Sequence, residues 1–167
     1  MIPSTWRALL AAALLSVAGH AAALEPPKGV PVLTLTGQIS HTNQGKSAVF
    51  DDAMLARLPQ KTLHVHAPWY PTPQTFEGPL LRDVLDAAGA SGKALNLTAL
   101  NDYVVAIPSD DATRYDVIVA RRLNGKPMSV REKGPLFVMY PFDSNPELRQ
   151  AEYYRRCAWQ LNRIEVE

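Results

Sequence analysis

Cysteine is almost absent from this sequence of 167 residues, and its one cysteine, Cys157, has no partner for an intramolecular disulfide. Cys157 follows Arg155 and Arg156 at the start of a predicted strand, where we expect it to act as a small buried hydrophobic residue. The glycine motifs that hold phosphates or dinucleotides are also missing, as is the G-x-S-x-G motif of many serine hydrolases. These absences argue against a nucleotide-binding fold and against a hydrolase.

An excess of either charge is lacking as well. Lysine and arginine number 17, aspartate and glutamate number 16, and the formal net charge is +1. Arg7 is the one lysine or arginine among residues 1–23, which hold no acidic residue, so the chain that follows is formally neutral. Nucleic acids and anionic membranes select proteins with a basic excess. The composition therefore argues against either as the main partner.

No apolar run is long enough to cross a bilayer, which takes about 20 residues. The longest run, residues 8–17, follows the positively charged Arg7 and precedes small residues of the A-x-A kind that end at Ala23. This pattern is typical of a secretory signal peptide. We therefore predict a leader over residues 1–23, one domain over residues 24–167 and a periplasmic location. An uncleaved membrane anchor is the alternative.

Short apolar runs bounded by turn residues predict a chain rich in strands. One clear helix is expected over residues 79–88, where apolar residues recur at helical spacing and Pro79 suits the first turn. Asp51 is expected to cap a shorter helix that ends at Pro59, and Asn124-Gly125 is expected to turn a hairpin. Strands outnumber helices without alternating with them, so the predicted class is α+β, with mixed β-sheets and a few short helices. The expected strands cover residues 32–36, 62–66, 94–100, 103–108, 116–121, 136–140 and 158–166.

A stiff loop with two aromatic residues is the first candidate for the wall of a binding site. Prolines at positions 68, 71 and 73 restrict the backbone around Trp69 and Tyr70, which excludes a helix or a central strand there. The loop would therefore present its rings at low entropic cost. The alternative is that Trp69 only fills the core beneath the loop.

Polar residues at the ends of apolar strands form a second set of candidates. If they converge on one rim with Trp69, an aromatic ring, a carboxylate and a cation together would suit a flat heterocycle. The alternative is that Asp102 only forms an Asx turn, and that Arg131 and Lys133 are solvated charges. The set comprises Asn101, Asp102, Tyr103, Arg131, Tyr140 and Asp143.

Two histidines, His64 and His66, share one face of a predicted strand, a spacing that can hold zinc or copper. No third ligand follows from the spacing. We therefore expect a histidine pair without a metal, and we identify no catalytic residue.

Four segments occur in an order that resembles the molybdopterin-binding oxidoreductase domain of sulfite-oxidase-like proteins. They are residues 76–85 (FEGPLLRDVL), 100–103 (LNDY), 123–128 (LNGKPM) and 133–141 (KGPLFVMYP). Residues 159–164 (WQLNRI) resemble the closing strand of that domain. The resemblance covers nearly the whole predicted domain, and it implies a mixed α+β fold and a pterin-type ligand.

The resemblance also has one departure. Catalytic members carry a cysteine whose thiolate binds molybdenum, just before the segment equivalent to residues 69–77, and His66 or Ala67 stands there in this chain. Short exported members that bind metal-free pterins, and that regulate inner-membrane proteins of cyclic di-GMP signalling, resemble this chain more closely. The resemblance thus implies a periplasmic pterin-binding sensory or regulatory protein that lacks molybdenum, binds rather than catalyses, and contacts the periplasmic region of such a signalling protein.

Two alternatives remain open. One is a periplasmic molybdopterin-dependent oxidoreductase or its redox subunit, with molybdopterin as the cofactor. The other is a ligand-free protein–protein interaction module. On the pterin-binding interpretation, Trp69 would stack on the ring and Asp102 or Asp143 would accept hydrogen bonds from its amino-pyrimidinone edge. The remaining candidates would line the rim, namely Tyr70, Asn101, Tyr103, Arg131 and Tyr140.

Overall fold

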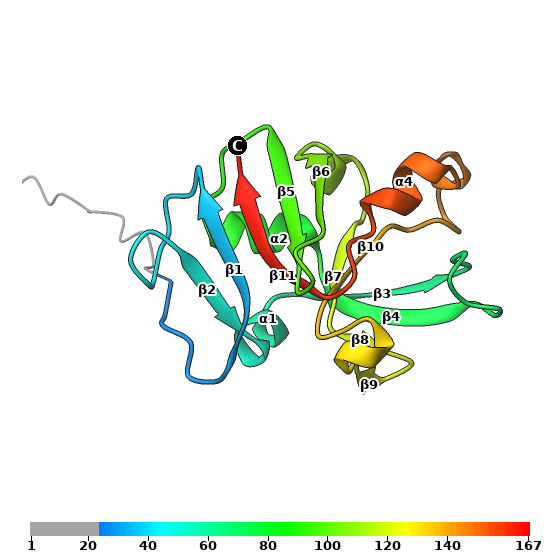
Figure 1. Ribbon diagram of the computed structural model, residues 1–167, viewed down its shortest axis with the longest axis horizontal. Coiled ribbons are helices and arrows are strands. Elements are labelled where there is room, and N and C mark those ends of the chain that lie inside the picture. Colours follow the sequence, from blue (N-terminus) through cyan, green and yellow to red (C-terminus); the bar gives the residue numbers. More distant parts are fainter. Residues whose placement is uncertain (1–23) are drawn as a thin grey trace, which may run out of the picture.

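The largest sheet of the computed structural model has five strands, in the order β2-β1-β11-β5-β6 (Figure 1). The structure describes residues 24–167, so the leader predicted over residues 1–23 lies outside its described part. β1 and β11 pair in parallel, and the other neighbours are antiparallel. In the view of Figure 1, helix α2 crosses behind this sheet. The bounds are β1 Pro31–Gly37, β2 Ala48–Asp51, β5 Ala94–Ala99, β6 Val104–Pro108, β11 Leu161–Val166 and α2 Leu81–Ala87.

Two smaller sheets form the other half of the molecule. β3 and β4 make a hairpin that extends away from the large sheet, and the segment with α4 extends on the same side (Figure 1). β4 also pairs with β8, which pairs with β9, while β7 pairs with β10. These strands are β3 Gln60–Val65, β4 Gln74–Pro79, β7 Ile118–Ala120, β8 Arg122–Leu123, β9 Lys126–Pro127 and β10 Phe137–Met139.

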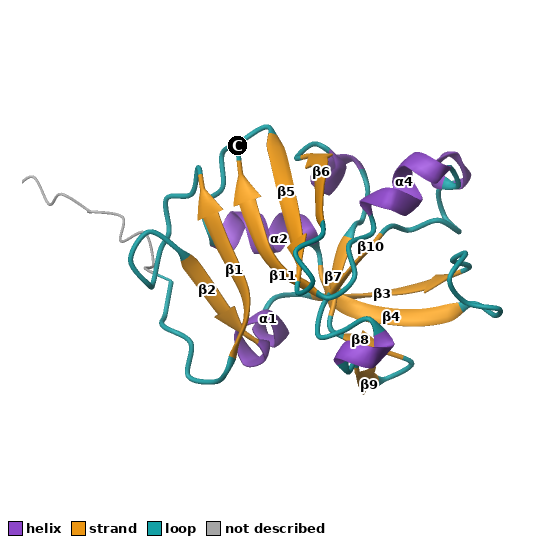
Figure 2. Cartoon of the chain, in the orientation of Figure 1, coloured by secondary structure: helices purple, strands orange, loops and turns teal. Residues whose placement is uncertain are grey.

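The helices are short and stand between the strands (Figure 2). Besides α2, they are α1 Asp52–Arg57, α3 Asp111–Arg114 and α4 Ala151–Arg156, with 3-10 turns η1 Val130–Glu132 and η2 Pro146–Leu148. Within residues 24–167, no helix is both long and apolar enough to span a membrane.

Strand β4 anchors the hairpin to the core. Gly78 lies so close to the backbone of Val119 that a Cβ at this position would collide with the Val119 carbonyl oxygen. The amide of Arg121 donates to the carbonyl of Glu77 over 2.8 Å. The base of the hairpin is therefore fixed, and the loop over residues 66–73 forms its tip.

Most of the elements expected from the sequence are confirmed, and the class is α+β with mixed sheets. Asp51 caps α1, because its carboxylate accepts a hydrogen bond from the Met54 amide over 2.8 Å. Asn124 and Gly125 both have positive φ and turn the hairpin of β8 and β9.

Three expectations are wrong in detail. Pro79 ends β4 instead of starting a helix, because Leu80 is extended and α2 begins at Leu81. Cys157 follows the last residue of α4, and the final strand begins only at Leu161. α4 itself was not predicted. No residue of α4 is fully buried, so its sequence lacks the apolar stripe by which a helix is recognised.

The ring of Phe137 is the common neighbour of the aromatic residues in this half of the molecule. Its side chain is fully buried on β10. The ring centroids of Phe76 and Trp69 each lie 5.6 Å from that of Phe137, and the centroid of Trp159 lies 6.2 Å away. Two tryptophans from distant parts of the chain thus rest on one core residue.

Replacing Phe137 with alanine is expected to lower the free energy of unfolding by about 3–5 kcal/mol, because the ring is fully buried and its loss leaves a cavity. Phe137→Leu should cost less than about 2 kcal/mol, since it keeps most of the apolar volume. Urea denaturation followed by circular dichroism measures both values. Equal losses for the two variants would contradict a cost that is set by the lost apolar volume.

Candidate functional site

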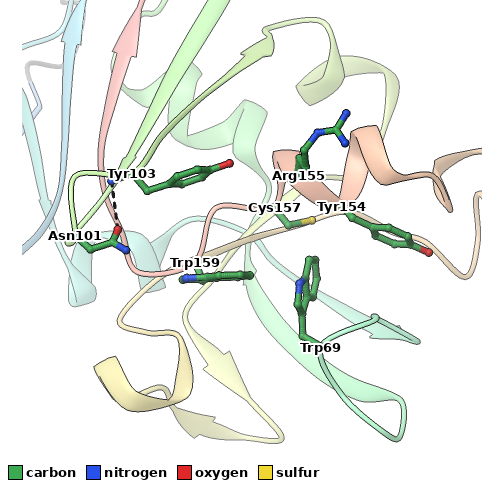
Figure 3. Close-up of a pocket in the computed structure, with 7 residues that line it drawn as sticks. All are labelled: Trp69, Asn101, Tyr103, Tyr154, Arg155, Cys157 and Trp159. Atoms are coloured by element: carbon green, nitrogen blue, oxygen red, sulfur yellow. Dashed lines mark hydrogen bonds between the residues drawn. The ribbon is translucent and has the colours of Figure 1, made fainter.

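A cavity of about 350 Å³ opens between three segments that are distant in the sequence. They are the loop that joins β3 to β4, the turn between β5 and β6, and the stretch from α4 to β11. Figure 3 shows the rings of Tyr103 and Trp159 facing one another across open space, with Trp69 at one end. The lining residues are Trp69, Asn101, Tyr103, Tyr154, Arg155, Cys157 and Trp159.

Trp69 both packs on the core and lines the cavity. It is half-buried, and its ring makes edge contacts with Tyr154 at 6.1 Å and with Trp159 at 5.8 Å between centroids. The planes of the two tryptophans are inclined at 83°. A flat ligand that stacks on one of them therefore meets the other with its edge.

Trp159 offers the more open face. Its side chain is 36% exposed, and Tyr103 opposite is 49% exposed. The ammonium group of Lys133 lies 4.7 Å from the centroid of the Trp159 ring, a cation–π distance. One side of the Trp159 ring is thus engaged by a cation, which leaves the other side for a ligand.

The polar groups around the cavity are mostly donors. The Asn101 side-chain oxygen accepts a hydrogen bond from the Tyr103 amide over 3.3 Å, which leaves the Asn101 side-chain nitrogen free to donate. Arg155 is exposed at the edge of the cavity. None of the seven lining residues carries a carboxylate. The cavity is therefore suited to a ligand that presents acceptors or negative charge.

Helix α4, which carries one wall, is held in place by a buried ion pair. The guanidinium of Arg156 donates to the carboxylate of Asp111 over 2.6 Å, and the hydroxyl of Tyr140 donates to the same oxygen over 2.7 Å. Asp111 is 3% exposed. Arg156 also pairs with Glu152 one turn earlier and lies over the ring of Tyr153. These contacts place Tyr154, Arg155 and Cys157 against the cavity.

Cys157 is the most enclosed of the lining residues. Burial raises the pKa of its thiol, and the sulfur donates a weak hydrogen bond to the Tyr153 carbonyl over 3.5 Å. The group is therefore a neutral thiol at physiological pH. It is not poised as a nucleophile.

Three of the eight residues predicted for the site line the cavity, namely Trp69, Asn101 and Tyr103. The other five do not. Tyr70 packs edge-on against Phe76, with a buried hydroxyl that has no hydrogen-bond partner, while Asp102 and Arg131 are exposed on neighbouring turns. The predicted place of Tyr140 on the rim is corrected, because its side chain is fully buried and bonded to Asp111.

Asp143 joins the loop over residues 66–73 to the segment that leads to α4. Its carboxylate accepts hydrogen bonds from the His66 amide over 3.1 Å and from the His66 ring over 2.8 Å, and Arg149 adds a contact of 3.3 Å. Asp143 thus fixes two walls of the cavity relative to one another instead of facing a ligand.

Four lining residues were not predicted as part of the site, namely Tyr154, Arg155, Cys157 and Trp159. The one signal in the sequence is the second tryptophan of residues 24–167, which follows soon after the lone cysteine. Its neighbours carry no motif, so only the folded chain brings Trp159 to Trp69.

His64 and His66 form hydrogen bonds to different residues. His64 bonds to the Thr75 hydroxyl and His66 to Asp143. Within residues 24–167, no group of three or more histidine, cysteine, aspartate or glutamate side chains is arranged to hold a metal ion.

Comparison with known proteins places this architecture in a family. The sequence model of the oxidoreductase molybdopterin binding domain matches residues 53–142, which is more than half of the chain. Among solved structures, the sulfane dehydrogenase SoxCD from Paracoccus pantotrophus superimposes with a TM-score of 0.58 at 18% sequence identity. The match covers 80% of this chain and 37% of that one, and no curated protein sequence matches the chain. The predicted sulfite-oxidase-like fold is confirmed.

The variant Asp143→Asn tests the link between the two walls. Partial burial alone would raise the pKa of Asp143, but the hydrogen bonds from His66 and the charge of Arg149 outweigh it and hold the pKa below its usual range. A carboxyl whose pKa is lowered by folding stabilises the protein above its unfolded pKa and loses that effect as the pH falls. Denaturation of both proteins should therefore show a deficit for the variant at pH 7 that shrinks by pH 3. A deficit that stays constant with pH would contradict this assignment.

Proposed function

The chain belongs to the oxidoreductase molybdopterin binding domain family, and from this premise we propose that it binds the pterin ring of molybdopterin in the cavity between Trp69 and Trp159. Its role would be that of an exported redox domain or the redox subunit of a larger oxidoreductase. One observation carries the proposal: both tryptophans of residues 24–167 line one cavity.

The ring portion of the cofactor fits the residues present. The volume of about 350 Å³ lies within the range of about 300–1,000 Å³ that is typical of small-molecule sites. The ring would stack on the open face of Trp159, with Trp69 closing the end of the cavity. The Asn101 side-chain nitrogen would donate to a ring carbonyl, and Arg155 would meet the anionic part of the cofactor.

The metal portion has one candidate ligand in this chain. Cys157 carries its single thiol, and that thiol lines the cavity. Molybdopterin with its metal supplies two-electron redox chemistry when bound. A thiol must lose its proton to ligate a metal, and burial opposes this loss at Cys157. The residues thus fit the ring better than the metal.

This imbalance favours a second candidate function, which is the binding of a metal-free pterin for signalling. The thiol of Cys157 is neutral and already donates to the Tyr153 carbonyl, so it offers no ready anionic ligand. On this candidate the protein acts in the periplasm and reports pterin to the periplasmic region of an inner-membrane signalling protein of the cyclic di-GMP type.

Addition of a reduced pterin to the purified protein is expected to quench most of its tryptophan fluorescence, because the third tryptophan, Trp6, lies in the predicted leader. Trp69→Ala should weaken binding at least about fivefold, which corresponds to about 1 kcal/mol, and Trp159→Ala should weaken it at least as much. Titration calorimetry measures these affinities.

His41→Ala is the matched control, since His41 carries a half-buried ring that bonds to the Ala87 carbonyl and lies outside this cavity. Its affinity for the pterin should equal that of the unmodified protein. Binding that survives both tryptophan substitutions would remove the proposed site. If the correctly folded protein binds no pterin, the proposed function is wrong.

Metal analysis separates the two candidates. Protein exported from a strain that makes the cofactor should contain molybdenum in a stoichiometric amount if it is a redox domain, and Cys157→Ser should lose the metal while keeping the pterin. A pterin found without molybdenum in the unmodified protein would instead support the signalling candidate. Mass spectrometry of the released small molecule reports the pterin independently of the metal.

A further inference from the structure

The exposed apolar side chains of this domain are gathered on one surface. Within residues 24–167, six large hydrophobic residues are exposed, with exposed fractions from 36% to 81%. They come from the segment before β1, the turn between β5 and β6, the first residue of β6, the turn η1 and the segment before β11. We call them the apolar surface: Val30, Leu100, Tyr103, Val104, Val130 and Trp159.

Hydrogen bonds hold three of the segments that carry this surface side by side. The Leu100 amide donates to the Gln160 carbonyl over 2.9 Å, and the Gln160 side chain donates to the Val130 carbonyl over 2.9 Å. Gln160 thus joins three of the contributing segments, and Figure 1 shows the turn between β5 and β6 beside the start of β11. A contiguous apolar area of this kind on a soluble domain marks an interaction site.

The apolar surface spans two neighbouring hollows. Tyr103 and Trp159 line the cavity proposed for the pterin. Val30, Leu100 and Val130 line a second cavity of about 480 Å³, whose other walls are also mostly apolar. The two hollows meet at the turn where Leu100 lines one and Asn101 the other, so each can receive a side chain of one extended polypeptide, which is how interface anchors are held. A bilayer is flat and would contact only the protruding side chains.

The charges that border the apolar surface are mainly positive. Arg131 and Lys133 stand next to Val130, and Arg155 stands at the edge of the first cavity. None of these three forms an ion pair within residues 24–167, whereas Asp52, Asp111, Asp116 and Asp143 all do. Two acids also border this surface: Glu132, which is bonded to Ser129, and Asp102, which is exposed in the turn between Leu100 and Tyr103. The three cations outnumber these two acids and none is neutralised by a carboxylate in an ion pair, so a net positive charge remains for a partner.

We propose that the apolar surface docks an extended polypeptide segment of a partner protein, rich in apolar and acidic side chains. Apolar side chains of the segment enter the two hollows, and its carboxylates meet Arg131, Lys133 and Arg155. The inference goes beyond the proposed function, because it depends on exposure and charge and needs no pterin in the cavity.

Selection of a random 12-residue peptide library displayed on phage, against the pterin-free protein, tests this proposal. The expected peptides combine leucine, phenylalanine or tryptophan with aspartate or glutamate. Their binding should weaken as salt is added, because exposed charges are screened. Peptides rich in lysine or arginine, or no enrichment at all, would overturn the proposal.

Variants then locate the binding. Leu100→Asp and Val130→Asp should each weaken the selected peptide about tenfold, and Arg131→Glu should weaken it by a similar factor. None of these residues lines the pterin cavity, so pterin affinity should not change and reports that the variants are folded. Lys46→Glu is the matched charge control on a distant exposed turn, and it should bind like the unmodified protein. Equal peptide affinity in all variants would place the binding elsewhere and overturn the assignment.

Two competing occupants give their own results. A dimer in sedimentation velocity that Leu100→Asp dissociates would assign the surface to a second copy of this chain. Co-sedimentation with phosphatidylglycerol vesicles that Val130→Asp abolishes would assign it to a membrane. Either outcome overturns the proposal, and neither bears on pterin binding, so failure here remains distinct from failure of the proposed function.

Discussion

The buried ion pair between Asp111 and Arg156 is the interaction on which the candidate site depends most. It joins α3 to α4, two helices too short to be stable alone, and it receives a further hydrogen bond from Tyr140 in the core. Without it, α4 would keep only aromatic contacts, because none of its residues is fully buried. The positions of Tyr154, Arg155 and Cys157 in the cavity therefore depend on one desolvated charge pair. Removing either partner would leave an unpaired charge in the core.

A second constraint comes from the aromatic core. Phe137 supports Trp69 and Trp159 at once, and the prolines of the loop restrict how Trp69 can move. The two tryptophans are therefore positioned before any ligand arrives. A preorganised aromatic cavity binds a flat ring without the cost of ordering its own side chains. This property serves a redox cofactor and a sensed pterin equally well, and the chemistry at Cys157 distinguishes between them.

The fold class and the part of the site formed by the loop over residues 66–73 were predicted from the sequence, because both depend on local signals. Alternating strands, the Asp51 cap and the Asn124-Gly125 turn are all encoded within a few residues. The part of the site formed by α4 and the residues after it was missed for a physical reason. α4 is held by a charge pair with Asp111, 45 residues away, and such long-range pairing leaves no periodic pattern. Asp143 was predicted to accept hydrogen bonds from a pterin, whereas its carboxylate bonds to His66. The two residues are 77 positions apart, so no local signal in the sequence indicates this contact.

The decisive measurement is a crystal structure of the protein grown with a reduced pterin. The ring should lie on Trp159, with Trp69 at the end of the cavity and the Asn101 side chain at its edge. A pterin bound to any other surface, or a cavity that stays empty at a saturating pterin concentration, would rule out pterin binding between the two tryptophans.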